Sequence, residues 1–178
     1  MKFSQEVFNK AIDFAANAHK TQMFPGKEYN YVVHLTQVTF ETINILLNDP
    51  MDNPDLPIQC ALLHDTIEDT EVTYENMLLN FGKDVADGVL ALTKNENLPK
   101  EDRMRDSLER LLKQPKQVQI VKLADRITNL QAPPHYWTKE KIVNYAEEAR
   151  VIHKYLKDAN DYGAERLLFK IAEYSKYA

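Results

Sequence analysis

Apolar residues recur at spacings of three and four along most of the chain, which is the period of an α-helix. Ser4 can cap the first such stretch, and we expect this helix to end near Thr21. One face of it carries Val7, Ala11, Phe14, Ala15 and Ala18. The alternation typical of strands is nearly absent, and the four glycines and eight prolines lie mostly between the periodic stretches. The pattern therefore predicts an all-α fold.

Later stretches repeat the helical pattern, and turn-forming residues separate them. The predicted helices cover about 33–47, the segment through ALLHD, and about 83–92, 100–113, 116–130, 139–159 and 164–177. Thr73 and Thr138 are predicted N-caps, because each stands within a hydrophobic staple. Gly82 and Gly163 are predicted breaks. The segment QMFPGKEYNY indicates a loop, and Pro57 suits the first turn of the helix through ALLHD.

Composition places the chain among ordinary globular proteins. The 178 residues, with 44% apolar and 28% charged side chains, fit one domain spanning 1–178. The net charge of −5 argues against a nucleic-acid footprint, and no stretch approaches the roughly 20 apolar residues that cross a bilayer. Cys60 is the only cysteine, which favours a reducing compartment. We therefore expect a soluble, cytoplasmic protein that binds neither nucleic acid nor membrane; no signal in the sequence sets its oligomeric state.

A dense ionisable cluster interrupts the apolar run at positions 61–70, which read ALLHDTIEDT. In a continuous helix, His64 and Glu68 are four residues apart, as are Asp65 and Asp69, so the segment presents two neighbouring acid-bearing columns. This arrangement is compatible with a catalytic site. It is equally compatible with a solvated helix end in which His64 is a hydrogen-bonded core histidine.

A second carboxylate falls on the apolar stripe of a predicted helix. In KQVQIVKLADRITNL, Asp125 follows the inward spacing of Val118 and Val121. Because an unpaired buried carboxylate is costly, Asp125 must be protonated, paired or bound to a metal ion. Lys122, three residues earlier, offers the alternative of a structural ion pair.

His34 completes the set of candidate ligands. It lies between apolar residues in YVVHLTQV, and alone it would be interpreted as a satisfied core histidine. Together, His34, His64, Asp65 and Asp125 supply two imidazoles and two carboxylates, which suit a borderline divalent cation such as Mn, Fe, Co, Ni or Zn. Their order along the chain, H … HD … D, is the signature of the HD phosphohydrolases.

The flanking residues make the resemblance more specific. ALLHDTIEDT and KLADRITNL closely resemble the two central motifs of the HD-superfamily alarmone hydrolases, namely the hydrolase domain of RelA/SpoT-type proteins and the stand-alone small alarmone hydrolases. The resemblance extends over almost the whole chain, from AHKTQ through YVVH and LPK to WTKEKIVNYAEEA. It implies a single all-helical HD domain.

The resemblance also implies an activity. Proteins of this family use Mn²⁺ to hydrolyse the 3′-diphosphate of (p)ppGpp, the alarmone of the stringent response, and release pyrophosphate. Carried over by motif, the ligands of the one metal ion are His34, His64, Asp65 and Asp125. Glu68 and Asp69 match the pair that activates and orients the attacking water.

Substrate contacts follow from the same motifs and from charge. Asn129 matches a residue that contacts the nucleotide, and Tyr145 and Lys100 fall where further contacts are expected. Lys20 and Lys122 are candidates, with other basic residues, for meeting the substrate phosphates. The expected partner is therefore a small nucleotide.

The sequence departs from the family at the loop after the first helix. Met23 and Phe24 stand where the family places a cationic pair that contacts the base, and Asn30 and Leu35 replace two prolines. Adenosine alarmones such as (p)ppApp are therefore alternatives to (p)ppGpp. Two further alternatives are another HD-type nucleotide phosphohydrolase or phosphodiesterase, and a nucleotide sensor that has lost turnover.

Overall fold

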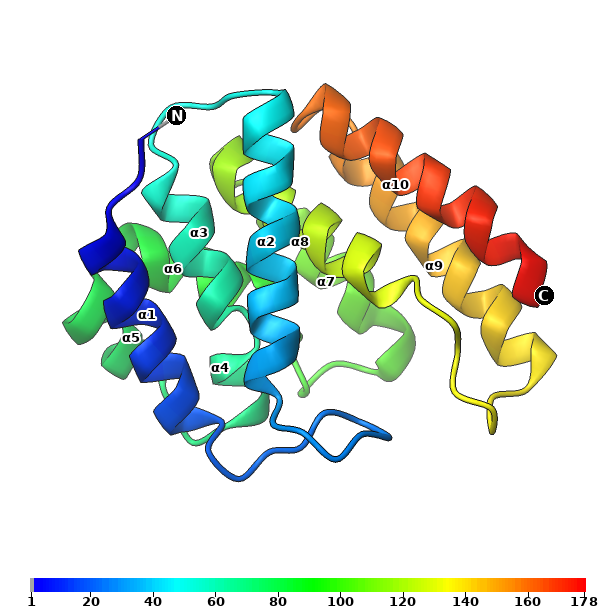
Figure 1. Cartoon of the computed structure of the whole chain (residues 1–178), viewed down its shortest axis with the longest axis horizontal. Helices are drawn as coiled ribbons and strands as arrows, with labels where there is room; N and C mark the ends of the chain where they lie inside the picture. The colour runs from blue at the N-terminus through cyan, green and yellow to red at the C-terminus, as the bar shows by residue number, and fades with distance from the viewer. Residues whose placement is uncertain (1) are drawn as a thin grey trace.

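Helices form all the regular structure that the computed structural model describes for residues 2–178 (Figure 1). The only strand-like pairing in this range is an isolated bridge between Met23 and Asn30. The elements are α1 (Gln5–Ala18), α2 (Val32–Asn48), α3 (Asp55–Leu63), α4 (Thr66–Asp69), α5 (Tyr74–Phe81), α6 (Lys83–Leu92), α7 (Lys100–Leu111), α8 (Lys116–Asn129), α9 (Lys139–Leu156), α10 (Asp161–Tyr174) and a closing 3₁₀ turn (Ser175–Tyr177). The predicted all-α fold is confirmed.

Three helices form the centre of the domain. Helices α2, α3 and α8 each pack against the other two, and their apolar faces meet in one continuous core that includes Leu35, Leu62 and Leu123. Helix α1 covers α3, and α9 and α10 pack against each other and against α8. Figure 1 shows α2 crossing the middle of the molecule, with α9 and α10 on one side and α1, α5 and α6 on the other. The candidate ligands therefore lie on the most enclosed helices.

The predicted caps form as expected. Ser4 accepts a hydrogen bond from the Val7 amide at 3.2 Å, Thr73 forms a capping box with Asn76, and Thr138 accepts from the Lys141 amide at 3.2 Å. Each cap satisfies a backbone N–H that the first turn of a helix leaves unpaired. Local chemistry therefore sets these three helix starts.

The two predicted glycine breaks have different outcomes. Gly82 separates α5 from α6 with φ of +79°, a left-handed conformation that favours glycine. Gly163 does not break a helix: α10 begins at Asp161, because the Asn160 side chain caps it by accepting from the Gly163 amide at 2.8 Å. A Cβ at Gly163 would lie 3.3 Å from Asn160 Oδ1 and 3.4 Å from Ile45 of α2, so its tightest neighbour is the capping side chain itself.

The helix through ALLHD is shorter than predicted. Helix α3 ends at Leu63, and α4 starts at Thr66 after Asp65 adopts φ of −98° and ψ of 0°. This backbone conformation lies in the bridge region, where the helical path is interrupted. The helical spacing that would align His64 with Glu68 and Asp65 with Asp69 is therefore interrupted at Asp65, and the alternative of a helix end at this point agrees with the structure.

The segment QMFPGKEYNY is a loop, as predicted, but an ordered one. The Phe24 amide donates to the Tyr29 carbonyl at 2.9 Å, the Tyr31 amide donates to the Gln22 carbonyl at 2.9 Å, and Gly26 turns the chain with φ of +74°. We call residues 22–31 the hairpin loop. Among the described helices, none has the length and apolar character needed to cross a membrane.

Candidate metal centre and active site

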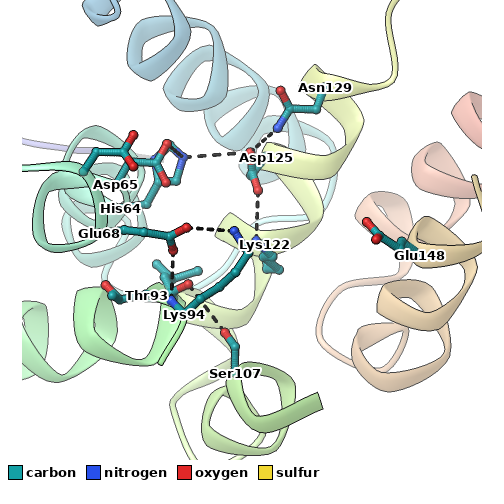
Figure 2. Close-up of polar contacts among 12 residues, drawn as sticks. His64, Asp65, Glu68, Thr93, Lys94, Ser107, Lys122, Asp125, Asn129 and Glu148 are labelled. Atoms are coloured by element: carbon teal, nitrogen blue, oxygen red, sulfur yellow. Dashed lines mark hydrogen bonds and ion pairs between the residues drawn. The ribbon is translucent and has the colours of Figure 1, made fainter. Parts of the chain in front are cut away.

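Four predicted ligands converge where α2, α3 and α8 meet. His34 comes from α2, His64 follows the last residue of α3, and Asp125 comes from α8; one donor atom of each lies within 4.8 Å of the others. Asp65 joins them, with Oδ2 at 3.0 Å from His64 Nε2 and 3.8 Å from His34 Nε2. Figure 2 shows His64 and Asp65 facing Asp125 across this space. The structure therefore brings together residues separated by up to 91 positions in sequence, from 34 to 125.

The orientation of His64 suits a metal ligand. Its Nδ1 lies 2.9 Å from the Ala61 carbonyl, which can only accept, so Nδ1 carries a proton and donates. Its Nε2 is buried and has no aligned hydrogen-bond partner among residues 2–178, although Asp65 Oδ2 is close. A histidine held in this way presents Nε2 toward the cluster, which is the usual arrangement of a metal-binding imidazole.

Neighbouring donors orient the two carboxylates. Asn129 donates to Asp125 Oδ1 at 2.6 Å, Lys122 donates to Oδ2 at 3.1 Å, and the Tyr31 hydroxyl donates to Asp65 Oδ2 at 2.5 Å.

Burial alone would raise the pKa of Asp125, but Lys122 and the two imidazoles hold that pKa well below its usual range. Burial likewise opposes ionisation of Asp65, and His64 beside it lowers the pKa. Both groups are therefore carboxylates.

The cluster also favours a positive charge at its centre. Burial disfavours the imidazolium of His64, yet the carboxylates of Asp65 and Asp125 raise the pKa of His64 to about 9. The metal-free site thus holds a proton where two carboxylates and two imidazole nitrogens converge. A divalent cation would place two positive charges at the same position. Two imidazoles and two carboxylates form a donor set that can bind such a cation.

Metal affinity is expected to depend on pH through His64. Below a pKa of about 9 the metal-free histidine is protonated, so a metal ion must displace this proton to bind. The apparent Kd for Mn²⁺ should therefore rise by about tenfold for each unit that the pH falls between 8 and 6. Titration calorimetry in buffers of different ionisation enthalpy measures both the Kd and the released proton. A Kd that is constant across this range would contradict the assignment.

The two acids of the HDTIED segment have different surroundings. Glu68 Oε2 accepts from the Lys94 backbone amide at 2.9 Å, and Oε1 pairs with Lys94 Nζ at 2.8 Å (Figure 2). Asp69 Oδ2 accepts from Gln22 Nε2 at 2.9 Å. Burial, with help from Asp65 and Glu68, raises the pKa of Asp69, and the Gln22 hydrogen bond partly opposes this rise. These surroundings make the Asp69 carboxylate more basic than an ordinary aspartate.

A cavity of about 830 Å³ opens beside the cluster. Its walls include His34, Asp65 and Asp125, both acids of the pair, and four of the predicted substrate contacts: Lys100, Lys122, Asn129 and Tyr145. The Arg126 guanidinium, also in the wall, stacks 4.2 Å from the centre of the Tyr145 ring and pairs with Glu148 at 3.3 Å. Lys20, the fifth predicted contact, lies exposed after α1 and outside this wall. The volume suits a nucleotide.

The hairpin loop places its two unusual residues differently. Met23 is about half exposed, whereas Phe24 packs its ring 5.9 Å from His34 and 6.3 Å from Tyr31, centre to centre. Neither side chain lines the cavity. Phe24 therefore packs against His34 and Tyr31 and does not face the cavity.

Sequence reasoning missed three contacts of the site. Tyr31, Gln22 and Lys94 hold Asp65, Asp69 and Glu68 respectively. Tyr31 lies three residues before His34, and this helical spacing is the one sequence signal that places it on the same face. No local signal pairs Gln22 with Asp69 or Lys94 with Glu68, because these partners are 47 and 26 residues apart.

An all-helical domain that gathers this ligand set beside a nucleotide-sized cavity defines a metal-dependent hydrolase of the HD type. The HD domain family model matches residues 11–164. The guanosine-3′,5′-bis(diphosphate) 3′-pyrophosphohydrolase MESH1 of Xenopus tropicalis is 33% identical over 156 residues, covering 85% of each chain. Human MESH1 is 33% identical over 168 residues, covering 90% of this chain and 92% of its own. The chain belongs to the HD-domain family and, within it, to the group of the MESH1 pyrophosphohydrolases.

Solved structures agree with this assignment. The structure described as a metazoan ortholog of SpoT that hydrolyzes ppGpp superposes with a TM-score of 0.79 at 27% identity, covering 99% of this chain and 97% of that one. A Listeria monocytogenes protein superposes with a TM-score of 0.61 at 21% identity, which shows a shared fold. The all-helical HD fold is thus confirmed by sequence and by structure.

Proposed function

We propose that this protein is a Mn²⁺-dependent hydrolase that removes the 3′-diphosphate of an alarmone nucleotide, (p)ppGpp or (p)ppApp, as pyrophosphate. One observation carries the proposal: two imidazoles and two carboxylates converge at the edge of the cavity that Glu68 and Asp69 also line. The named activity of the MESH1 relatives supports the same reaction. We further propose that the protein acts in the cytoplasm, where buried Cys60 stays reduced.

His34, His64, Asp65 and Asp125 would hold the metal ion. When bound, a divalent cation lowers the pKa of a water molecule and stabilises charge on a phosphoryl oxygen. The mixed nitrogen and oxygen ligands also accommodate Fe, Co, Ni or Zn, and Mn²⁺ is proposed on the family resemblance. Asn129, Lys122 and Tyr31 keep the two carboxylates ionised and oriented.

The protein groups supply the proton transfer. Asp69 accepts a proton from the attacking water, because one of its oxygens is held by Gln22 and the other has no hydrogen-bond partner among residues 2–178. The water oxygen forms a bond to phosphorus, the bond from phosphorus to the 3′ oxygen breaks, and that oxygen takes a proton from solvent while Asp69 releases its proton to solvent. The products are pyrophosphate and a nucleotide with a free 3′ hydroxyl. Glu68, with both oxygens bound by Lys94, fixes the lysine and the orientation of α4.

Basic and polar groups of the cavity wall meet the nucleotide. Lys100 and Arg126 offer positive charge to phosphates, and the Tyr145 ring offers a face for stacking. Asn129 keeps its carbonyl oxygen and second N–H for the nucleotide while donating to Asp125. Because Met23 and Phe24 provide no cation near the base, we propose that the protein accepts both guanine and adenine alarmones.

Substituting Glu68 by glutamine should lower kcat by about 10- to 100-fold and leave the metal in place, because Lys94 loses its charged partner while the four ligands are untouched. Metal content after desalting and initial rates measure the two effects. Exposed Glu109→Gln serves as the matched control. A Glu68→Gln enzyme with normal kcat would refute the role given to Glu68.

Product identity tests the proposed reaction. Purified, Mn²⁺-loaded protein is incubated with ppGpp and with ppApp, and the products are identified by ³¹P NMR. Pyrophosphate from either nucleotide supports the proposal. Orthophosphate in place of pyrophosphate would instead support another HD-type phosphohydrolase, turnover of an added cyclic nucleotide would support a phosphodiesterase, and tight binding without any product would support a nucleotide sensor.

A further inference from the structure

We propose that His19 acts through Gln22 to position Asp69, so that the side chains of His19, Gln22 and Asp69 form one relay of hydrogen bonds. His19 Nδ1 lies 2.6 Å from Gln22 Oε1, and Gln22 Nε2 donates to Asp69 Oδ2 at 2.9 Å. The inference rests on the proposed function, because it concerns the acid that accepts the proton of the water. His19 and Gln22 are positioning residues in this scheme.

The chemistry of the amide gives the relay a direction. Gln22 turns its donor nitrogen toward Asp69, so its acceptor oxygen faces His19. His19 Nδ1 must therefore carry the proton. The other ring nitrogen, Nε2, is buried without a hydrogen-bond partner among residues 2–178, so Gln22 is the only polar contact of this imidazole there. A buried histidine with one polar contact serves either that hydrogen bond or the packing around it. Experiment can separate these two roles.

The backbone holds the relay in register. The Gln22 amide donates to the His19 carbonyl at 3.0 Å, and the Tyr31 amide donates to the Gln22 carbonyl at 2.9 Å. Asn30 Nδ2 also donates to the His19 carbonyl at 3.1 Å. His19 is 1% exposed and ends α1, so the relay starts from a fixed point in the fold. The hairpin loop thus reaches two acids of the site, Asp69 through Gln22 and Asp65 through Tyr31.

The relay determines which carboxylate oxygen of Asp69 is available to accept a proton from the water. Gln22 occupies Oδ2, which leaves Oδ1 as the oxygen available from a residue that lines the cavity. Glu68 cannot take over this role, because Lys94 binds both of its oxygens. Without Gln22, Asp69 is free to rotate about its side-chain bonds, and without His19 the amide of Gln22 is free to turn over. Both changes should lower kcat and spare substrate binding.

Kinetics of four single variants and of the double variant Gln22→Leu/His19→Phe test the relay in the metal-loaded protein of residues 1–178. Gln22→Leu and His19→Phe remove the hydrogen bonds, His19→Asn restores a donor near the position of Nδ1, and exposed Gln5→Leu is the matched control. We expect kcat to fall about 10- to 100-fold in Gln22→Leu and His19→Phe, with KM within about twofold and metal content unchanged. His19→Asn should recover most of the activity. The double variant should be no slower than Gln22→Leu alone, because His19 acts only through Gln22.

Three kinetic outcomes would overturn the relay: unchanged kcat in Gln22→Leu, equal losses in His19→Phe and His19→Asn, or additive losses in the double variant. A spectroscopic readout is independent of turnover. Imidazole ¹⁵N shifts should show His19 with the proton on Nδ1, and Gln22→Leu should remove the downfield Nδ1 proton resonance. If the wild-type protein does not hydrolyse the nucleotides, the proposed function fails, and an Nε2-protonated His19 would separately refute the relay.

Discussion

Substituting His64 by alanine is expected to strip the metal from the protein and to lower kcat/KM by roughly a thousand-fold. His64 Nε2 is the buried nitrogen that lies nearest to Asp65 and within 3.8 Å of Asp125. Without it, one imidazole and two carboxylates remain, and the ion loses a ligand that the Ala61 carbonyl holds in the binding orientation. The lost rate corresponds to the several kcal/mol that a metal ion contributes to stabilising phosphoryl charge.

Metal content by emission spectroscopy after desalting, together with kcat/KM, measures this effect. His135→Ala is the matched control, because His135 is exposed and lies outside the cavity wall, and it should keep both metal and activity. Circular dichroism verifies that the His64→Ala protein retains its helices. A folded His64→Ala protein that still holds one equivalent of metal would show that His64 is not a ligand.

Substituting Asp69 by asparagine should lower kcat by about 10²- to 10⁴-fold, the range of a lost general base, while the metal stays bound. The amide cannot accept a proton from the water, whereas none of the four ligands changes. Stability should not suffer, because burial raises the pKa of Asp69 and a neutral side chain avoids that cost.

Rates, metal content and thermal unfolding of the Asp69→Asn protein are compared with those of Asp13→Asn, an exposed aspartate of α1. The contrast with Glu68→Gln, for which a smaller loss is expected, separates the two acids of the pair. If Asp69→Asn turned over within a factor of ten of the wild-type protein, another group would have to accept the proton.

Much of the fold follows from local pattern. Helix α6 begins and ends where its apolar spacing and Gly82 indicate, and Thr73 and Thr138 cap the helices that follow them. The rest depends on contacts that periodicity does not report. Gly163 lies inside α10 because the Asn160 side chain caps that helix by accepting from the Gly163 amide. The helical path is interrupted at Asp65, whose carboxylate lies 3.8 Å from His34 of α2.

The residues of the site that belong to the sequence motifs could be predicted from the sequence. His34, His64, Asp65 and Asp125 come together as the ligand order implies, because α2, α3 and α8 are mutual neighbours. The groups that hold these residues were not predictable in the same way. Gln22 and Lys94 reach their acids across the fold, and the ion pair between Lys122 and Asp125 exists beside the cluster and does not replace it. The ion pair expected as an alternative is therefore present, and it lies within the same cluster as His34 and His64.

We expect this site to hydrolyse the 3′-diphosphate of an alarmone with the help of a divalent metal ion. The most direct test follows pyrophosphate release from ppGpp by the chelated protein and by the same protein reloaded with Mn²⁺. We expect one pyrophosphate for each nucleotide consumed after reloading, and almost none in chelator. Equal rates in both samples, or no pyrophosphate from folded protein with one equivalent of metal bound, would contradict it.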